Sequence, residues 1–252
     1  MLATFKMKIN TLTKVCCALI IWCFFSCNSK LSTQPVTNIS LIGAKIDILQ
    51  LPEDKQLNEV LVELFDSEGK SIRNEGLIIY INGDSLTLQK RQGLYYTDES
   101  RYLERDVPVK DSYVIEIQLS DGKKYPLGTI NVLKQIEEKN IIVDKKGDLT
   151  KDFVVKWNNI EQVSELSVRQ SIILSGFPAN EENMASRNEI IIPTYGFGIY
   201  TLNHHNFSDS EGVLDLVELE FRAFKMGKTS PILLAGSEIK IHSELKKVIF
   251  FK

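Results

Sequence analysis

The sequence predicts an all-β protein built from two antiparallel β-sandwich domains. Short stretches alternate apolar and polar residues with a period of two, which is the pattern of a half-buried strand in an antiparallel sheet. Turn residues interrupt these stretches about every ten residues, a spacing typical of sandwiches. No segment carries a sustained 3.6-residue apolar period, so we expect little helix.

The first 26 residues have the order of a secretory signal peptide. Lys6, Lys8 and Lys14 precede an uninterrupted apolar run over residues 15–25, and no acidic residue comes before that run. A membrane-spanning helix needs about 20 apolar residues, so this run is too short to span a bilayer. We therefore expect residues 1–26 to direct export and to be removed.

All four cysteines of the chain lie in or just after this run. A signal peptidase needs a small side chain before its cut, and only Cys27 follows one, Ser26. The stretch FFSC, which ends at Cys27, resembles the lipobox of bacterial lipoproteins. The resemblance implies that Cys27 receives a diacylglycerol, that the chain is cut before it, and that the new amino terminus is acylated. An ordinary cleaved signal, which leaves a soluble product with a free thiol, is the alternative.

Charge and cysteine content narrow the class of the mature protein. Removing residues 1–26 takes away three lysines and no acid, which changes the formal net charge from -3 to -6. A mildly acidic body argues against a nucleic-acid binder and against a polybasic membrane surface. Cys27 is the only cysteine left, so no disulfide forms within the chain. The remaining length fits two domains of roughly 100–120 residues each.

Residues 28–38, NSKLSTQPVTN, are small and polar and include a proline. This composition predicts a tether, which we place at residues 27–40, between a lipid anchor and the folded body. No acidic residue occurs between Cys27 and Asp47. In some lipoproteins of this kind, acidic residues just after the cysteine direct export to the cell surface. Their absence here favours an outer-membrane protein that faces the periplasm.

The first sandwich is predicted over residues 41–136. Its strands are indicated by alternating apolar residues, and its hairpins by Asn-Gly and Asp-Gly pairs, which accept the positive φ of tight turns. The alternating sets are Val60, Val62 and Leu64, followed by a turn at Gly69, and Tyr113, Ile115, Ile117 and Leu119. The turn pairs are Asn82–Gly83 and Asp121–Gly122.

The second sandwich is predicted over residues 137–252. The segment VLKQIEEKN is charged and lacks a turn signal, so we place the junction between the domains near Glu137. Two later strands have a clear apolar face. These faces are Phe153, Val155 and Trp157, and Val217, Leu219, Phe221 and Ala223, the latter opposite Glu218, Glu220 and Arg222.

Both halves resemble immunoglobulin-like or fibronectin-type-III-like modules. The stretch DLTKDFVVKWNN is similar to an early fibronectin-type strand that ends in a core tryptophan, here Trp157. The stretch VPVKDSYVIEIQL is similar to the strand that begins with a tyrosine-corner tyrosine, here Tyr113. This resemblance implies architecture and does not dictate an activity.

Catalytic and metal-binding motifs are weak or missing in the sequence. His204 and His205 are adjacent, and on a strand they point to opposite faces, so we expect no metal there. Asp209 and Glu211 lack the spacing of a calcium loop, which favours a plain turn. The GKT at Gly227 lacks the preceding glycine of a P-loop, and no G-x-S-x-G occurs. We expect no enzyme, no metal and no cofactor other than the lipid.

Aromatic residues beside turns are the candidate binding residues. The stretch GLYYTDESRY contains Tyr95, Tyr96 and Tyr102, and the stretch PTYGFGIY contains Tyr195, Phe197 and Tyr200. Rings with a polar tip beside turns can stack on a sugar or anchor a protein, and Tyr95, Tyr96 and Tyr195 are the residues we expect to make the contact. The alternative is that such rings cover the open ends of the core. We expect a lipid-anchored envelope protein that binds or scaffolds a protein or glycan. The second hypothesis is a hydrolase, or its glycan-binding accessory, that acts on polysaccharide or cell wall.

Overall fold

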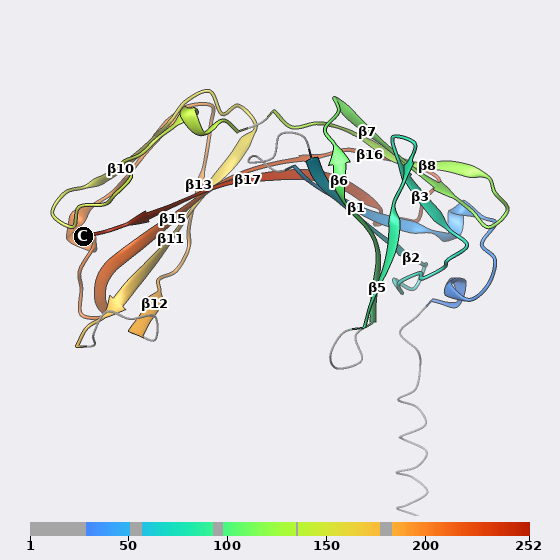
Figure 1. The fold of residues 1–252 in the computed structure, drawn as a ribbon, viewed down its shortest axis with the longest axis horizontal. Coiled ribbons are helices and arrows are strands. Elements are labelled where there is room, and N and C mark those ends of the chain that lie inside the picture. The colour runs from blue at the N-terminus through green and yellow to red at the C-terminus, as the bar shows by residue number, and fades with distance from the viewer. Residues whose placement is uncertain (1–28, 51–56, 93–97, 135, 177–182) are drawn as a thin grey trace, which may run out of the picture.

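The computed structural model describes residues 29–50, 57–92, 98–134, 136–176 and 183–252, and this part of the chain is all-β (Figure 1). The helical segments within these ranges are 3₁₀ turns of three residues. These turns are η1 (Lys30–Ser32), η2 (Ile39–Leu41), η3 (Glu138–Asn140) and η5 (His204–Asn206). No helix among the described residues is long and apolar enough to cross a membrane.

The strands form one large sheet and two small ones. The nine-stranded sheet has the order β12-β11-β15-β17-β1-β2-β6-β5, and β13 pairs with β11 beside β12. Its strands are β12 (Met184–Ser186), β13 (Ile190–Pro193), β11 (Val163–Leu174), β15 (Gly212–Met226), β17 (Glu238–Phe250), β1 (Gly43–Gln50), β2 (Leu57–Phe65), β6 (Asp98–Pro108) and β5 (Thr87–Gln92).

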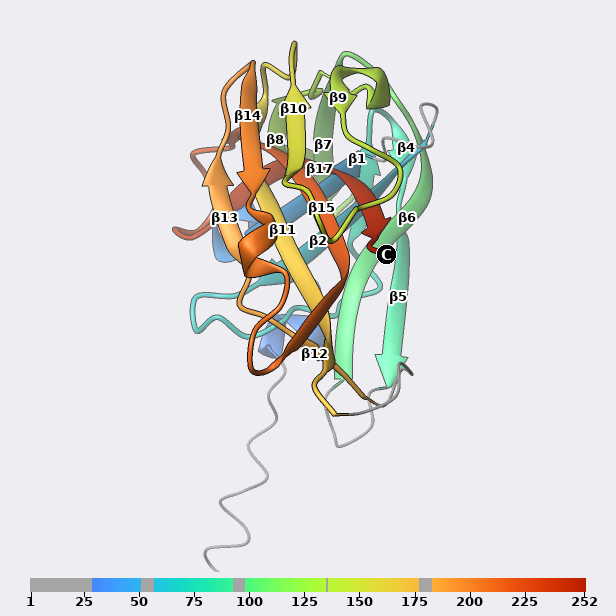
Figure 2. The same ribbon diagram turned by 90° about the vertical axis from the view of Figure 1, so that its left-hand side faces the viewer.

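Each small sheet covers a different part of the large one (Figures 1 and 2). The five-stranded sheet consists of β16 (Lys228–Thr229), β8 (Lys124–Asn131), β7 (Ser112–Gln118), β3 (Ile78–Ile81) and β4 (Asp84–Ser85). The three-stranded sheet consists of β14 (Gly198–Leu202), β10 (Phe153–Trp157) and β9 (Ile141–Ile142). We call the half that contains the five-stranded sheet the first lobe and the half that contains the three-stranded sheet the second lobe.

Strand β17 belongs to both lobes. Along one edge it pairs antiparallel with β15, from Lys240 to Phe250. Along the other edge its first residues, Glu238–His242, pair parallel with β1 of the first lobe. The sequence predicts two separate sandwiches that meet near Glu137. In the structure the two lobes instead share one large sheet, which continues across that boundary.

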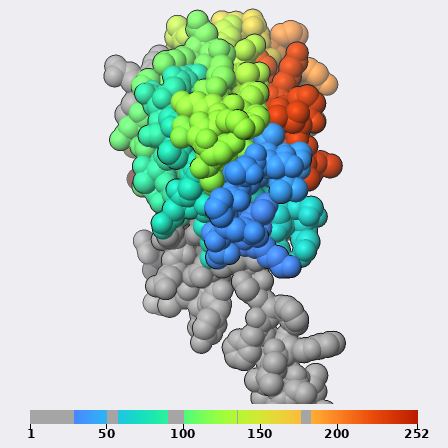
Figure 3. Space-filling view, turned by 90° about the vertical axis from the view of Figure 1, so that its right-hand side faces the viewer, coloured from blue at the N-terminus to red at the C-terminus, as the bar shows by residue number. Residues whose placement is uncertain are grey.

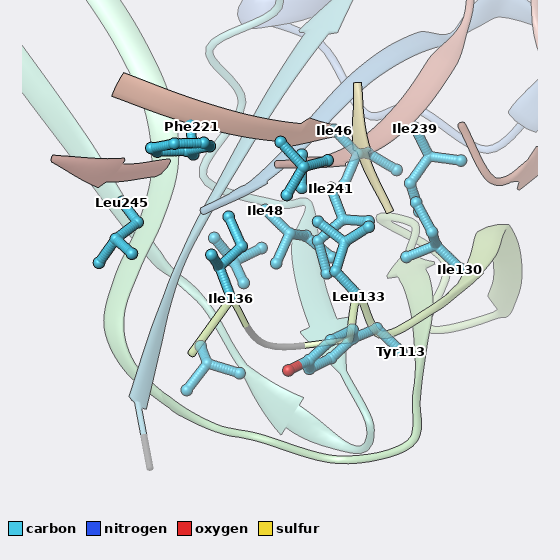
Figure 4. Packing of buried hydrophobic residues seen from close by; sticks show 14 of the residues in the cluster. Ile46, Ile48, Tyr113, Ile130, Leu133, Ile136, Phe221, Ile239, Ile241 and Leu245 are labelled. Atoms are coloured by element: carbon cyan, nitrogen blue, oxygen red, sulfur yellow. The ribbon is translucent and has the colours of Figure 1, made fainter. Parts of the chain in front are cut away.

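The hydrophobic core is also continuous between the lobes (Figure 4). Leu133 and Ile136, in the segment that the sequence predicts as a charged junction, are both buried. The backbone N–H and C=O of Leu133 are both hydrogen-bonded to the side-chain amide of Gln50, at 3.1 and 3.0 Å. The junction is part of the core because its two apolar residues occupy the space between the lobes.

The strand faces and turns predicted from the sequence are confirmed. Every apolar residue of the alternating sets is buried, Tyr113 among them, and the Tyr113 hydroxyl contacts the backbone of Lys110 as a tyrosine corner requires. Asn82 and Gly83 both have positive φ, at 50° and 96°, which is the conformation of a type I′ hairpin turn. Gly69 and Gly122 also have positive φ in their turns.

The predicted tether is wrong for residues 29–40, which pack against the first lobe (Figure 3). Val36 is buried, and its backbone exchanges two hydrogen bonds with Ser120, at 2.9 and 3.0 Å. The side-chain amide of Asn74 donates to two backbone oxygens of this segment. Polar composition predicted a flexible linker, but these long-range contacts fix the backbone as an irregular layer on the lobe.

Candidate functional site: an exposed aromatic loop

The second lobe has an aromatic loop where the chain crosses from the large sheet to the small one. The loop, residues 194–197, joins β13 in the nine-stranded sheet to β14 in the three-stranded sheet. Both strands lie at the edge of their sheets. A four-residue connection spans at most about 14 Å, and two packed sheets lie roughly 10 Å apart. The loop is therefore just long enough to cross between the sheets.

Hydrogen bonds hold the backbone of this loop in place. Thr194 donates twice to the first residues of β11, from its N–H to Ser164 O at 2.9 Å and from its hydroxyl to Val163 O at 2.9 Å. The indole N–H of Trp157 donates to Tyr195 O at 3.1 Å. These contacts connect the loop to both layers, because Trp157 lies on β10 of the small sheet.

Trp157 supports the loop from below. Its ring is buried against Phe221 of β15, with ring centroids 5.9 Å apart in an edge-to-face arrangement. A Cβ added at Gly198 would lie 2.2 Å from a ring atom of Trp157, so only glycine permits this close approach. The predicted core role of Trp157 is confirmed, and the tryptophan also positions the loop above it.

The two aromatic side chains of the loop are exposed although its backbone is fixed. Tyr195 is 77% exposed and Phe197 is 79% exposed. Tyr200 on β14 instead packs against the core, and its burial raises the pKa of its hydroxyl. The loop therefore presents one tyrosine and one phenylalanine to solvent from a backbone that is already ordered.

The sequence predicts Tyr95, Tyr96 and Tyr195 as binding residues. The structure describes Tyr195, and its side chain is exposed as expected. Tyr95, Tyr96 and the predicted lipid attachment residue Cys27 lie outside the described residues. Phe197 belongs to the same aromatic stretch of the sequence, PTYGFGIY, and it is exposed beside Tyr195. Its position between Gly196 and Gly198 marks a loop and not a strand interior.

The histidine pair has a different geometry from the one expected. His204 and His205 lie in the 3₁₀ turn η5 and not on a strand, so their rings meet, with centroids 4.0 Å apart. His204 Nδ1 lies 2.6 Å from a carboxylate oxygen of Asp152. Among the residues that the structure describes, no group of three or more histidine, cysteine or acidic side chains is arranged for a metal ion. Asp209 accepts hydrogen bonds from two backbone N–H groups of its own turn.

The face of the nine-stranded sheet turned away from the small sheets carries an ion-pair network, which we call the outer-face charge network. Its members are Glu165, Arg169, Glu189, Glu218, Glu220, Arg222 and Lys246. Glu220 is only 2% exposed, and its carboxylate lies 3.0 Å from Arg222 Nε and 3.4 Å from Arg169 Nη2. Burial alone would raise the pKa of Glu220, but the hydrogen bond and charge of Arg222 hold this pKa below its usual range. We assign this network a stabilising role.

Three open depressions formed by described residues lie away from the aromatic loop. One of about 670 Å³ lies between β9 and β17 and is lined by four lysines, of which Lys247 is paired with Glu138. The others, of about 440 and 140 Å³, lie beside the N-terminal segment. Tyr195 and Phe197 line none of these three depressions.

No protein-family model matches the chain, and no curated protein sequence matches it. Among solved structures it is similar to the native conformation of E. coli alpha-2-macroglobulin, at 12% identity over 88% of this chain and 15% of that one, with a TM-score of 0.25. It is also similar to the Bacteroides ovatus mixed-linkage glucan utilization locus protein SGBP-B, in complex with a mixed-linkage heptasaccharide, at 14% identity over 87% of this chain and 45% of that one, with a TM-score of 0.21. A third is the Yersinia pseudotuberculosis adhesin InvE, at 10% identity, 83% and 58% coverage and a TM-score of 0.23. The chain spans less than two thirds of each of these proteins.

Proposed function

We propose that this chain is a lipid-anchored, non-catalytic binding protein of a bacterial cell envelope, and that it holds a partner protein at the aromatic loop. The observation that carries the proposal is the pair of exposed rings, Tyr195 and Phe197, on a backbone fixed by hydrogen bonds from both layers. Binding then orders little further chain, which removes part of the entropic cost of association. Aromatic side chains of this kind dominate the energetics of protein interfaces.

A protein partner fits this surface better than a glycan. The next exposed side chain along the chain is Ile199, at 61%, which offers apolar area and no group for sugar hydroxyls. Each aromatic side chain buries roughly 150–250 Å² when it is covered, at about 25 cal/mol per Å². After the costs of association, we expect Tyr195→Ala and Phe197→Ala each to weaken binding by about 2–3 kcal/mol, which is about 30- to 150-fold.

The lipid anchor on Cys27 would hold the body close to the membrane. Ser29 is already buried in the first lobe, with its N–H bonded to Ser71 O at 3.1 Å. Two residues span at most about 7 Å, so a lipid at Cys27 places the first lobe next to the bilayer surface. The second lobe, which carries the aromatic loop, lies at the other end of the molecule (Figure 1). In this arrangement the protein displays its binding loop away from its own membrane.

The anchor is tested by metabolic labelling with a palmitate analogue. The wild-type chain should be labelled and Cys27→Ala should accumulate as an unlabelled, uncut precursor. An unlabelled mature wild-type protein would contradict the anchor and support an ordinary cleaved signal. Protease treatment of intact cells then separates a surface-exposed body from one that faces the periplasm of the outer membrane, the orientation we propose.

The loop is tested by a photo-crosslinking amino acid at position 197 in intact cells. We expect a crosslinked partner protein from this position, and none from the same substitution at Phe250, which is also an exposed phenylalanine of the second lobe. Identical products from both positions, or none from position 197, would contradict the placement. Binding to isolated polysaccharide that is lost in Phe197→Ser would instead support the glycan-binding hypothesis.

A further inference from the structure

One side of the second lobe presents two edge strands without a single charge. The stretch over residues 190–202, IIIPTYGFGIYTL, contains no acidic or basic residue. It supplies β13, at the edge of the large sheet, and β14, at the edge of the small sheet. The short loop between them keeps both on the same side of the lobe, where Figure 2 shows them near each other. We call this the β13–β14 side.

The other strands that terminate the three sheets in the described part of the chain are protected in ways that natural proteins use against strand addition. Strand β5 contains Lys90 and Arg91 in its sequence. Strands β4, β9, β12 and β16 have only two or three residues each. The part of β17 that extends beyond its pairing with β1 contains Glu244, Lys246 and Lys247.

Strand β14 has neither protection. It has five residues, and it pairs with β10 along its whole length on one side only. Alternate residues of an edge strand direct N–H and C=O groups away from the sheet, so β14 offers a row of backbone groups to an added strand. On its outer face Ile199 and Thr201 are exposed. These exposed side chains carry no charge, so β14 offers no ion pair to a charged strand and no repulsion to an identical one.

We propose that the β13–β14 side is the interface of a homodimer in which β14 pairs antiparallel with β14 of a second copy. An antiparallel pair of identical strands obeys two-fold symmetry, so the same patch serves on both subunits. A register centred on Tyr200 places Ile199 opposite Thr201 of the other copy, on the outer face. The two three-stranded sheets then become one continuous sheet of six strands, and no like charges are brought together.

This inference goes beyond the proposed function, because it concerns self-association and not a partner. In this antiparallel dimer the two aromatic loops lie at opposite ends of the paired strands, with the two copies of residue 197 offset by roughly 20 Å along the strand direction. A partner that contacts both loops then dissociates more slowly than from one, since the second contact forms at a high effective concentration. Self-association itself needs neither the lipid nor the partner.

The test uses the full-length chain, solubilised in detergent, with its mass measured by sedimentation over a wide range of concentrations. The wild type should be a dimer that dissociates on dilution. Ile199→Lys, which puts a lysine on the edge, should raise the dissociation constant at least about tenfold. The matched control is Ile142→Lys: Ile142 is 56% exposed on β9, the opposite edge of the same sheet, and both isoleucines lie opposite Lys156. This control should remain dimeric.

A wild type that is monomeric at every concentration would overturn the proposal, as would equal dissociation of both variants. Thr201→Lys provides a second edge variant, and thermal unfolding of each variant shows that a loss of dimer is not a loss of fold. With the crosslinking amino acid at position 197, Tyr195→Ala should weaken the partner crosslink and keep the dimer, whereas Thr201→Lys should lose the dimer and keep the crosslink. Failure of the homodimer is thereby distinguished from failure of the partner site.

Discussion

Replacing Arg222 by methionine tests whether the outer-face charge network stabilises the fold. Arg222 contacts Glu220 through two nitrogens, at 3.0 and 3.1 Å, and it also contacts Glu165 and Glu189 at 3.0 and 3.1 Å. Without Arg222 the carboxylate of Glu220, which is almost fully buried, loses its main partner. Breaking a buried ion pair by removing one member costs about 3–5 kcal/mol.

Two features of the structure reduce this value. The side chain of Arg222 is 24% exposed, and Glu220 keeps Arg169 at 3.4 Å and Lys246 at 3.9 Å. We therefore expect Arg222→Met to lower the free energy of unfolding by about 2–3 kcal/mol at pH 7. For a chain of this size that corresponds to a fall of about 4–12 °C in Tm. The double variant Glu220→Met/Arg222→Met should recover part of the loss, because it removes the buried charge as well.

The assay is urea unfolding followed by the fluorescence of Trp157, which packs against Phe221 next to the substituted position. Arg105→Met is the control, because Arg105 is 73% exposed and pairs with Glu59 at 3.3 Å on the surface; no measurable change is expected. The pKa of Glu220 is held below its ordinary value, so its stabilising contribution is present above that value and is lost as pH falls. The cost of Arg222→Met should accordingly shrink in acid. A variant as stable as wild type at pH 7, or one with the same loss at acidic pH, would refute the reasoning.

Three further predictions follow from the packing. Gly198→Ala should destabilise the protein by about 1–3 kcal/mol and shift the fluorescence of Trp157, because the added Cβ would lie 2.2 Å from the tryptophan ring. Gly196→Ala is the control: the nearest atom to a Cβ at position 196 is 4.0 Å away, so this change should be tolerated. Equal effects of the two changes would contradict this explanation. Fragment 29–136 should not fold, because it lacks β16 and β17, which pair with its strands β8 and β1. Circular dichroism tests this, and a cooperative melt of the fragment would show that the first lobe folds by itself. Burial would raise the pKa of Asp47, but His242 and Lys240 of β17 hold that pKa below its usual range. Asp47→Asn should therefore destabilise the protein above about pH 4 and have little effect in stronger acid, as measured by thermal unfolding across pH.

Local sequence determined the strands and turns because their signals are local. Alternation every second residue reports which face of a strand is buried, and Asn-Gly or Asp-Gly pairs report backbone conformations that few other residues adopt. This is why the buried face that includes Phe153 and Val155, and the turn at Asn82–Gly83, are all found as predicted. The exposure of Tyr195 was also predictable from its position in a loop, but the hydrogen bonds that fix its backbone were not.

The chain by itself therefore determined an all-β body with its strand faces and hairpin turns, and it placed an aromatic residue on a loop. Only the tertiary structure decided that Glu238–His242, at the far end of the sequence, pairs with β1 and joins the lobes through one large sheet. It also decided that residues 29–40 pack, and that Glu220 is buried on a face that alternation predicts to be solvated. The physical reason is that pairing between distant strands and the desolvation of a charge depend on neighbours in space. A period of two along one strand carries no information about those neighbours.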